Sequence, residues 1–266
     1  MSTIAIAGMG WLGLPLAARL QELGHQVKGS VTSQSKQEEL RSYGLDVYRV
    51  EIAEDEIRGE IQSFLDQGEI LIILIPPGLR HNTGHNNALR MAQLLDAVEK
   101  SDVEKVILIS STGVYDDAQG KVTEADLPQP QHDKGKQLVE VEQLFFKSPA
   151  IETTIIRFGG LTGGTRNPVK YLAGRSGLSN GAAPVNLIHR EDCIGIILAV
   201  IYKNAFGHII NAVHPDHPTK EEYYTRQAQE LNLELPQYDS EEEETFKQVD
   251  SITLKSVLGY NFQVQP

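Results

Sequence analysis

Three glycines near the N-terminus have the spacing that binds a dinucleotide phosphate. Gly8, Gly10 and Gly13 form a GxGxxG pattern directly after an apolar run and at the start of a helical one. The first glycine permits a tight turn, the second lets the backbone approach a pyrophosphate, and the third allows close helix-to-strand packing. The pattern predicts a dinucleotide site that includes Gly8, Gly10, Trp11, Leu12 and Gly13.

The residues that follow the second apolar run indicate which dinucleotide binds. An NAD site normally places an Asp or Glu about 20 residues beyond the glycines, where it holds the ribose hydroxyls. This chain has no acidic residue between Glu22 and Glu38. Thr32, Ser33 and Lys36 stand there instead, and their hydroxyl and amine groups suit a 2′-phosphate. We therefore expect NADP as the cofactor, with NAD as the alternative.

Trp11 is the only tryptophan of the chain and lies inside the glycine loop. We expect its fluorescence to respond when a dinucleotide binds. The alternative role is structural, because a large aromatic ring at this point can fix the first helix against the sheet.

Two further segments carry polar residues next to predicted strands. Residues 109–115 read ISSTGVY and end one strand, whereas residues 186–192 read NLIHRED and precede a helix. With the glycine loop, they resemble the extended or atypical short-chain dehydrogenase/reductases, the NAD-dependent epimerase/dehydratase family. The likeness is strongest to small members of uncertain activity that begin with GxGWLGxPLA, as residues 8–17 do here. It spans nearly the whole chain, with the motifs in the same order.

The resemblance implies an active site at the end of the ISSTGVY strand. In the family, a Ser or Thr at the position of Ser111 hydrogen-bonds the substrate oxygen and steadies developing charge. The family's acid/base is a Tyr with a Lys four residues later, whose charge lowers the phenol pKa. No Tyr of this chain has a Lys four residues later. The nearest pattern is an HxxxK at His132 and Lys136. If the register is shifted by two residues, Lys134 and Leu138 instead take the positions of the family's Tyr and Lys.

Three interpretations of the missing Tyr stay open. His132 can act as acid/base, since imidazole titrates near neutral pH. Tyr115 can supply a phenol from the serine segment, or the protein binds a dinucleotide without hydride transfer. We therefore expect an NAD(P)-dependent oxidoreductase or epimerase-like enzyme that acts on a small polar substrate, for which a sugar is one candidate. The candidate catalytic residues are Ser111, Tyr115, His132 and Lys136, and the alternative is a non-catalytic NADP(H)-binding regulatory protein.

The resemblance also places three pairs of residues around the cofactor. One pair would cradle the adenine, one lies where the backbone would pass the sugar and phosphates, and one ends a strand near the nicotinamide. In that order the pairs are Glu51 and Ile52, Pro76 and Pro77, and Phe158 and Gly159. Glu51 has an alternative role as an ordinary exposed acid.

Apolar runs and amphipathic segments alternate along most of the chain. Strands are predicted at 3–7, 26–31, 46–50, 70–75, 105–109, 153–158 and 207–211, and helices at 12–23, 35–43, 88–100, 134–146, 192–202 and 220–231. This βαβ alternation predicts the α/β class, with a Rossmann-type doubly wound parallel sheet.

We expect one unit over residues 1–266. Its dinucleotide-binding core would comprise 1–159 and 185–211. A small C-terminal substrate lobe at 160–184 and 212–266 would lie over the carboxyl ends of the strands.

The composition narrows the classes of partner. The 266 residues include 24 Lys and Arg against 36 Asp and Glu, and a net charge of -12 disfavours nucleic acid and anionic membranes. Because there is no signal peptide or long apolar stretch, and Cys193 is the only cysteine, we expect a cytoplasmic protein that binds a small-molecule substrate. His81 and His85 have metal-compatible spacing but no nearby carboxylate, so no metal is expected. The oligomeric state is left open.

Overall fold

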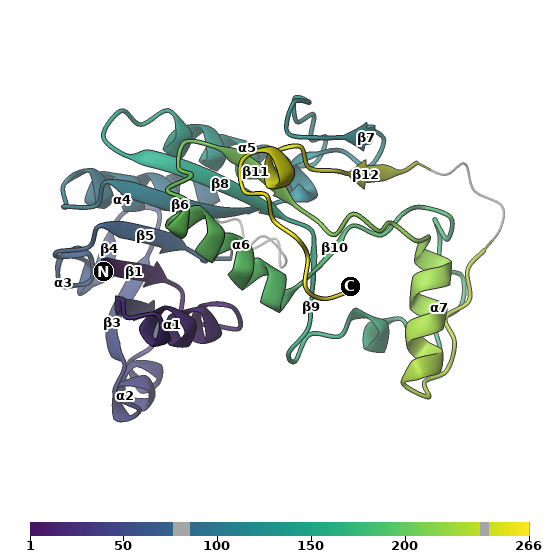
Figure 1. Ribbon diagram of the computed structural model, residues 1–266, viewed down its shortest axis with the longest axis horizontal. Coiled ribbons are helices and arrows are strands. Elements are labelled where there is room, and N and C mark those ends of the chain that lie inside the picture. Colours follow the sequence, from purple (N-terminus) through teal and green to yellow (C-terminus); the bar gives the residue numbers. More distant parts are fainter. Residues whose placement is uncertain (77–85, 240–244, 266) are drawn as a thin grey trace.

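An eight-stranded sheet forms the centre of the computed structural model, which describes residues 1–76, 86–239 and 245–265 (Figure 1). Its strands are β1 (Thr3–Ala7), β2 (Gln26–Val31), β3 (Asp46–Ile52), β4 (Ile57–Gly59), β5 (Ile70–Ile73), β6 (Lys105–Ser111), β8 (Glu152–Phe158) and β11 (Ile209–Ala212). Their order is β11-β8-β6-β5-β1-β2-β3-β4. Every pair is parallel except β3 with β4. The predicted Rossmann-type α/β fold is confirmed.

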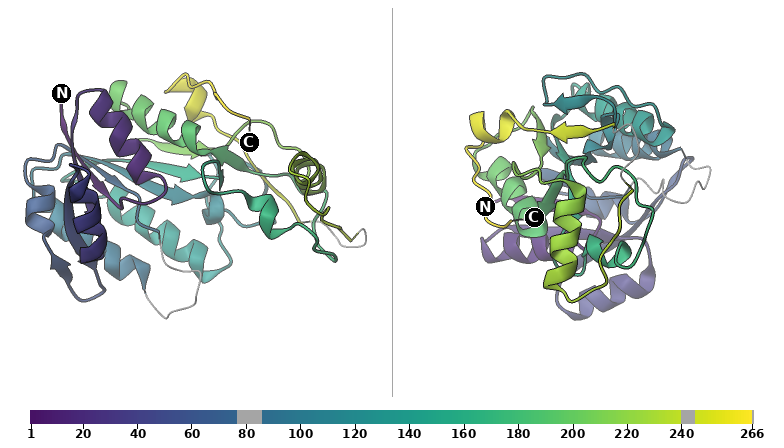
Figure 2. Two further views of the ribbon diagram at one scale, coloured as in Figure 1. Left: turned by 90° about the horizontal axis from the view of Figure 1, so that it is seen from below. Right: turned by 90° about the vertical axis from the view of Figure 1, so that its right-hand side faces the viewer.

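Helices cover both faces of this sheet (Figure 2). They are α1 (Gly13–Glu22), α2 (Gln34–Ser42), α3 (Ile61–Leu65), α4 (Asn87–Glu99), α5 (Asp133–Phe146) and α6 (Arg190–Tyr202). Ile70 and Ile72 pack on the face of α1 and α6, whereas Leu71 and Ile73 pack on the face of α4 and α5. Both faces of β5 are buried, which is why its sequence is continuously apolar. No helix within the described residues is long and apolar enough to cross a membrane.

The order of the strands decides where a ligand can enter. β1 lies between β2 and β5, and the chain builds outward from it in both directions. Ligands of doubly wound sheets bind in the crevice at such a reversal, outside the carboxyl ends of the strands. The glycine loop follows β1 directly and therefore lies at this crevice.

A C-terminal lobe, built from residues 160–186 and 213–239, extends beyond the carboxyl ends of the strands, on the right of Figure 1. It contains β9 (Gly160–Thr162), the 3-10 helix η3 (Pro168–Tyr171) and α7 (Lys220–Glu230). The strand β10 (Leu187–His189) pairs with β9 and leads back to α6.

The end of the chain leaves this lobe, so the expected lobe segment 212–266 is too long. β12 (Lys247–Val249) pairs with β7 (Gly120–Val122), and α8 (Thr253–Ser256) follows it. Leu254 and Leu258 join the apolar cluster that contains α6, because burying them there removes apolar surface from water. The buried Asp192 carboxylate accepts hydrogen bonds from the Tyr260 hydroxyl and the Gln263 backbone and so anchors the tail.

A buried ion pair joins β8 to α5. The Arg157 guanidinium donates to the Glu142 carboxylate at 2.6 and 2.9 Å, and both side chains are only 4% exposed. Burial opposes the charge of Arg157, yet the hydrogen bonds and charge of Glu142 hold its pKa above the usual value. Arg157 also donates to the Tyr115 hydroxyl at 2.7 Å, which extends the contact to the 3-10 helix η2 (Thr112–Val114).

Removing one partner of this pair should strongly destabilise the protein. We expect Arg157→Met or Glu142→Leu to lower the free energy of unfolding by about 3–5 kcal/mol, since an unpaired charge stays buried. The double variant should be less destabilised than the two single effects together, because no buried charge is left unpaired. Urea unfolding followed by circular dichroism measures these values.

The exposed pair Lys100 and Asp96 supplies the control. Its atoms lie 2.6 Å apart with both side chains more than 60% exposed, so Asp96→Leu should cost at most about 1 kcal/mol. Equal losses at the buried and exposed pairs would contradict the role given to Arg157 and Glu142.

Candidate functional site

The glycine loop between β1 and α1 disfavours a side chain at two of its three glycines, at Gly8 through its backbone conformation and at Gly13 through a steric clash. Gly8 has a φ of +110°, and an added Cβ would lie 3.3 Å from the Leu74 backbone. A Cβ on Gly13 would lie 2.1 Å from the Gly8 carbonyl oxygen. A Cβ on Gly10 would meet nothing within 4 Å, so this glycine borders open space above the loop. The turn at Gly8 and the close packing at Gly13 are those that the spacing predicts, and the approach of a pyrophosphate to Gly10 stays a prediction.

The start of α1 presents unpaired backbone donors beside this loop. Leu12 precedes the helix without a side-chain cap, and no acidic residue lies in the first turn. Among the described residues, the backbone N–H groups of Trp11 and Leu12 have no hydrogen-bond acceptor. Unpaired N–H groups and the positive end of the helix dipole together favour a bound phosphate.

The carboxyl end of β2 lies next to this loop. The Met9 backbone N–H donates to the Ser30 carbonyl at 3.0 Å, which ties the two segments together. Thr32 is exposed just beyond the strand. The Ser33 hydroxyl caps α2 by accepting a hydrogen bond from the Lys36 backbone, and the Lys36 ammonium pairs with Glu39 at 2.9 Å.

The other residues predicted around the cofactor lie at the same edge of the sheet. Ile52 ends β3 and is buried, and its carbonyl accepts a hydrogen bond from Arg90, while Glu51 is half-buried beside it. Phe158 ends β8 and is buried, and a Cβ on Gly159 would lie 2.6 Å from the Asn186 carbonyl oxygen. Pro76 is exposed beyond β5, whereas Pro77, like His81 and His85, lies outside the described residues. Their contacts with a cofactor stay predictions.

Ser111 is the last residue of β6 and is half-buried. Its hydroxyl oxygen accepts a hydrogen bond from the Gly113 backbone at 3.1 Å, so its own hydrogen is left to donate. The neighbouring Ser110 hydroxyl is buried and has no partner among the described residues. Ser111 therefore offers a donor at the end of a central strand, whereas Ser110, its neighbour in the strand, points to the opposite face of the sheet.

Tyr115 lies inside a buried network instead of facing the crevice. Its side chain is 1% exposed, and its hydroxyl accepts from Arg157 and faces the Thr123 carbonyl at 2.9 Å and the Asn211 amide at 3.2 Å. Burial raises the pKa of this phenol, against the opposing effect of the Arg157 charge. This placement gives Tyr115 a packing role.

The packing of α5 favours the shifted register over the HxxxK pattern. Leu138 faces the serine segment, and its Cδ1 lies 3.8 Å from the position of a Cβ on Gly113. Lys136 is exposed and lies near Asp133. Residues two apart on a helix point to nearly opposite sides, so Lys136 cannot share the face of Leu138. His132 precedes the helix as its N-cap, and its exposed side chain makes no capping hydrogen bond.

Two arginines that sequence reasoning missed meet the Trp11 ring. The guanidinium carbon of Arg166 lies 4.5 Å from the ring centroid, and that of Arg190 lies 5.6 Å away. Arg166 belongs to the loop after β9, and Arg190 begins α6. The NLIHRED segment contains Arg190, but nothing in its spacing shows that this residue reaches the glycine loop.

A cavity of about 260 Å³ opens between the end of β8 and the C-terminal lobe. Its polar lining residues are Asp117, Asn180, Asn186, Lys220, Tyr224, Thr245 and Lys247. The Lys247 ammonium is held by the Asp117 carboxylate at 2.9 Å and the Tyr115 carbonyl at 2.7 Å. Gly160 also lines the cavity, two residues beyond Phe158, the residue that pairs with Ser111 across the sheet.

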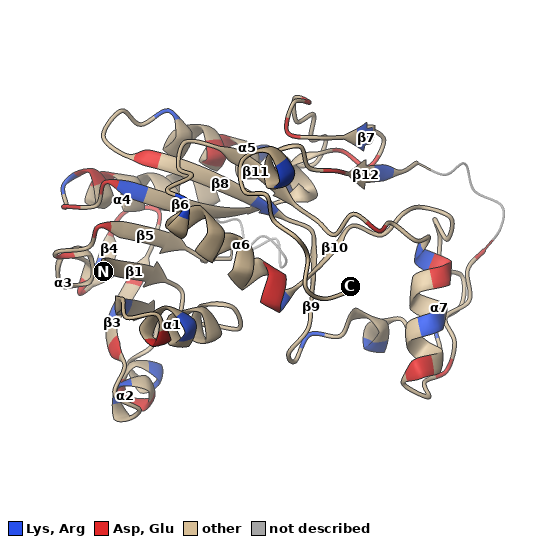
Figure 3. Cartoon of the chain, in the orientation of Figure 1, with Lys and Arg blue, Asp and Glu red and all other residues tan. Residues whose placement is uncertain are grey.

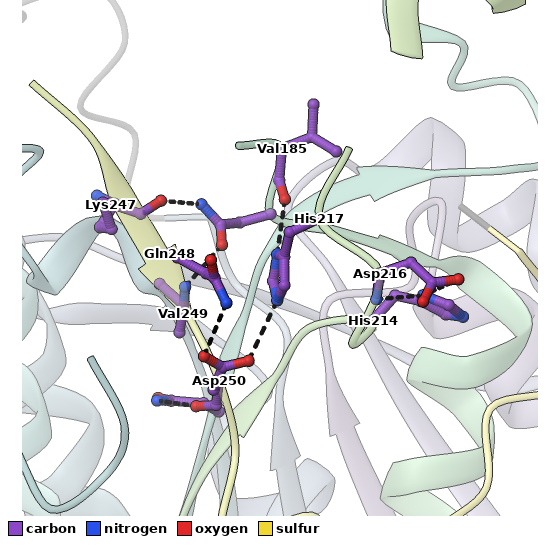
Figure 4. A network of polar contacts seen from close by, with 10 residues as sticks. Val185, His214, Asp216, His217, Lys247, Gln248, Val249 and Asp250 are labelled. Atoms are coloured by element: carbon purple, nitrogen blue, oxygen red, sulfur yellow. Dashed lines mark hydrogen bonds and ion pairs between the residues drawn. The ribbon is translucent and has the colours of Figure 1, made fainter. Parts of the chain in front are cut away.

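One wall of this cavity is fixed by hydrogen bonds to β12. The Asn186 amide donates to the Lys247 carbonyl and accepts from the Val249 backbone, at 2.7 and 2.8 Å. Behind that wall, the His217 ring lies between the Val185 carbonyl and the Asp250 carboxylate (Figure 4). These lining residues come from distant parts of the chain, and of the polar ones only Asn186 belongs to a segment that the sequence singled out, NLIHRED.

Residues 8–201 match a family model described as NAD(P)H-binding. The chain therefore belongs to this NAD(P)H-binding family. It is similar to Protein YeeZ of Escherichia coli K12, with 34% identity over 267 residues, 99% of this chain and 96% of that protein.

Several solved structures share the fold at low sequence identity. UDP-N-acetylglucosamine 4-epimerase from Bacillus cereus has a TM-score of 0.80 and 15% identity, covering 99% of this chain and 95% of that one. UDP-glucose 4-epimerase from Thermotoga maritima has a TM-score of 0.80 and 17% identity, covering 99% and 94%. UDP-glucuronic acid 4-epimerase from Bacillus cereus, in complex with NAD, has a TM-score of 0.79 and 19% identity, covering 99% and 92%.

Binding of a dinucleotide should change the fluorescence of Trp11, because its ring belongs to the loop that would hold the phosphates. Titration with NADPH, followed by tryptophan emission, measures this change. Trp11→Phe is the control: it should lose the tryptophan signal, and the emission of NADPH itself should still report the binding that the backbone donors of the loop supply. Unchanged tryptophan emission in a protein shown by calorimetry to be saturated would contradict the placement of Trp11.

Proposed function

We propose that the protein is an NAD(P)-dependent oxidoreductase or epimerase-like enzyme that acts on a small polar substrate, with a sugar derivative as the first candidate. The observation that carries this proposal is the shared edge of the sheet. The glycine loop follows β1, Ser111 ends β6, and the cavity begins at Gly160 just beyond β8. A substrate in the cavity and a cofactor on the glycine loop would approach each other at this edge.

The residues of this chain have distinct parts in the proposed reaction. The nicotinamide ring supplies hydride transfer when the cofactor is bound. Ser111 donates its hydroxyl hydrogen to the substrate oxygen and stabilises the charge that develops there. Of the predicted acid/base groups, His132 is exposed and makes no capping bond, whereas Tyr115 is held in a buried network. Of these two groups, His132 is the one left to transfer a proton in this proposal, and Leu138 at the inward position of α5 supports the second candidate function instead.

We also infer that the cofactor is NADP. The support is electrostatic, since no carboxylate lies between residues 23 and 37 and the end of β2 carries Thr32 and Ser33. The start of α2 adds the positive end of a helix dipole, again without an acidic residue in its first turn. A 2′-phosphate would meet hydroxyl groups there, and the Lys36 side chain would exchange its exposed ion pair with Glu39 for the phosphate.

A second candidate function is a non-catalytic, NADP(H)-responsive binding protein. The observation that favours it is Leu138, which occupies the inward position that the family's Lys takes in the shifted register. An apolar side chain cannot lower the pKa of a neighbouring phenol or hold a ribose. This candidate predicts dinucleotide binding without turnover.

Placing a carboxylate at the end of β2 should reverse the cofactor preference. We expect the wild-type protein to bind NADPH more tightly than NADH. Thr32→Asp should weaken NADPH binding by about tenfold or more, because the carboxylate repels the 2′-phosphate. The same carboxylate can accept hydrogen bonds from the ribose hydroxyls of NADH, so NADH binding should not weaken. Calorimetric titration with both cofactors measures the change. Thr32→Asn is the control, since its side chain has nearly the same shape as Asp without the charge, and it should keep the preference for NADPH. If the wild-type protein bound NADH more tightly than NADPH, the inference of NADP as the cofactor would be wrong.

Removing the Ser111 hydroxyl should slow turnover without affecting cofactor binding. Loss of one such donor typically lowers kcat by about 100- to 1000-fold, so Ser111→Ala should show a loss of that size. The assay follows absorbance at 340 nm with a panel of nucleotide sugars, sugars and aldehydes. Ser110→Ala is the matched control, with a neighbouring serine removed. Absence of turnover by the wild type with every substrate and both cofactors would favour the binding protein instead.

A further inference from the structure

The Trp11 cluster, defined as Trp11, Arg166 and Arg190, joins the glycine loop to the C-terminal lobe. Arg166 lies over the indole ring at 4.5 Å and Arg190 at 5.6 Å, measured from each guanidinium carbon to the ring centroid. Figure 3 shows basic residues in the loop after β9 and at the start of α6. Two cations are thus gathered beside a predicted phosphate loop, in a chain whose net charge is -12.

A glycine turn in the lobe makes this arrangement possible. Gly163 and Arg166 exchange two backbone hydrogen bonds of 3.0 Å, which closes a tight turn. Gly164 within it has a φ of +56°, and an added Cβ would lie 2.4 Å from Arg190 Nη1 and 3.2 Å from Trp11 Nε1. The missing side chain of Gly164 therefore leaves the space that the arginine and the indole occupy.

Two donors of the cluster have no protein acceptor. Trp11 Nε1 and Arg190 Nε are both buried and make no hydrogen bond within the described residues. The carboxylate that faces Arg190 is Glu191, 3.5 Å from Nη2 and mostly exposed, which is a weak contact. Buried N–H donors are nearly always paired in folded proteins, so two unpaired donors within one cluster indicate a missing acceptor.

We propose that the Trp11 cluster binds a phosphate or pyrophosphate group. The Nε and Nη edge of a guanidinium is a planar fork that matches two phosphate oxygens, and an indole N–H can donate to a third. The unpaired backbone N–H groups of Trp11 and Leu12 lie in the same loop and supply further donors. The lobe thereby contributes cations to a site that the glycine loop alone would bind through its backbone.

Two molecules can bring this group, namely the dinucleotide and a phosphorylated substrate. The dinucleotide is favoured because Trp11 itself belongs to the glycine loop, whereas the cavity lining does not include any residue of the cluster. The assignment of the phosphate to a dinucleotide rests on the proposed function. The shared chemistry is the phosphate, and the experiment separates the two sources.

The test compares Arg190→Met and Arg166→Met with the wild-type protein. Binding of NADPH is followed by the emission of its nicotinamide, and binding of ADP-ribose by displacement of NADPH. Arg226→Met is the matched control, since Arg226 stacks on Tyr223 in α7, away from the cluster. Melting curves verify that each variant is folded. Arg190→Lys is the second variant, which keeps the charge and loses the fork.

We expect each Arg→Met variant to bind NADPH and ADP-ribose at least tenfold more weakly, with a shallower dependence on salt, and Arg226→Met to be unchanged. Arg190→Lys should fall between the wild type and Arg190→Met. Unchanged affinities for both nucleotides and for inorganic pyrophosphate would overturn the proposal.

Inorganic pyrophosphate separates the remaining outcomes. If the variants bind NADPH normally, but no longer bind pyrophosphate when saturated with NADPH, the group belongs to the substrate and the assignment to the dinucleotide is overturned. If the wild type binds no dinucleotide at all, the proposed function fails. The cluster is then judged by pyrophosphate alone, and loss of that binding in the Arg→Met variants still supports it.

Discussion

The buried contact between Arg157 and Glu142 constrains the arrangement of the candidate site. A buried charge without its partner is strongly destabilising. If α5 rotated or slid on β8, the ion pair would break and leave such a charge, so the pair holds the two elements in one arrangement. Arg157 also holds the Tyr115 hydroxyl, and through it the segment that follows Ser111. The same contact thus positions the serine segment and determines which face of α5 meets it, and this is why Leu138 points inward.

The proposed phosphate recognition relies on local donors, since the overall charge of the chain is unfavourable for an anion. The glycine loop offers backbone N–H groups at a helix start, where the dipole adds positive potential. The Trp11 cluster places two arginines at the same loop from another part of the chain. A chain with a net charge of -12 can therefore hold an anion, because donors within a few ångströms outweigh distant, screened charges.

The resemblance to epimerases is strongest in the scaffold and weakest at the acid/base. The strand order, the glycine loop and the serine at the end of β6 follow the family pattern. At the inward position of α5 the chain carries an apolar residue, and the phenol of Tyr115 serves packing. A fold of this kind supports many reactions, so the proposed activity would depend on a proton-transferring group near Ser111.

The sequence by itself determined the parallel strands of the sheet, most of the helices beside it and the glycine loop, because these depend on residues close together in the chain, whereas the antiparallel edge strand β4 was not predicted. β5 and β6 are apolar on both faces, and side chains are disfavoured at Gly8 and Gly13, so local pattern was sufficient. Only the tertiary structure decided the register of α5, the return of the tail to α6, and the meeting of Arg166 and Arg190 with Trp11. Those contacts join residues that are far apart in sequence, and their pairing is fixed by packing and by the need to satisfy buried charges, neither of which leaves a local pattern.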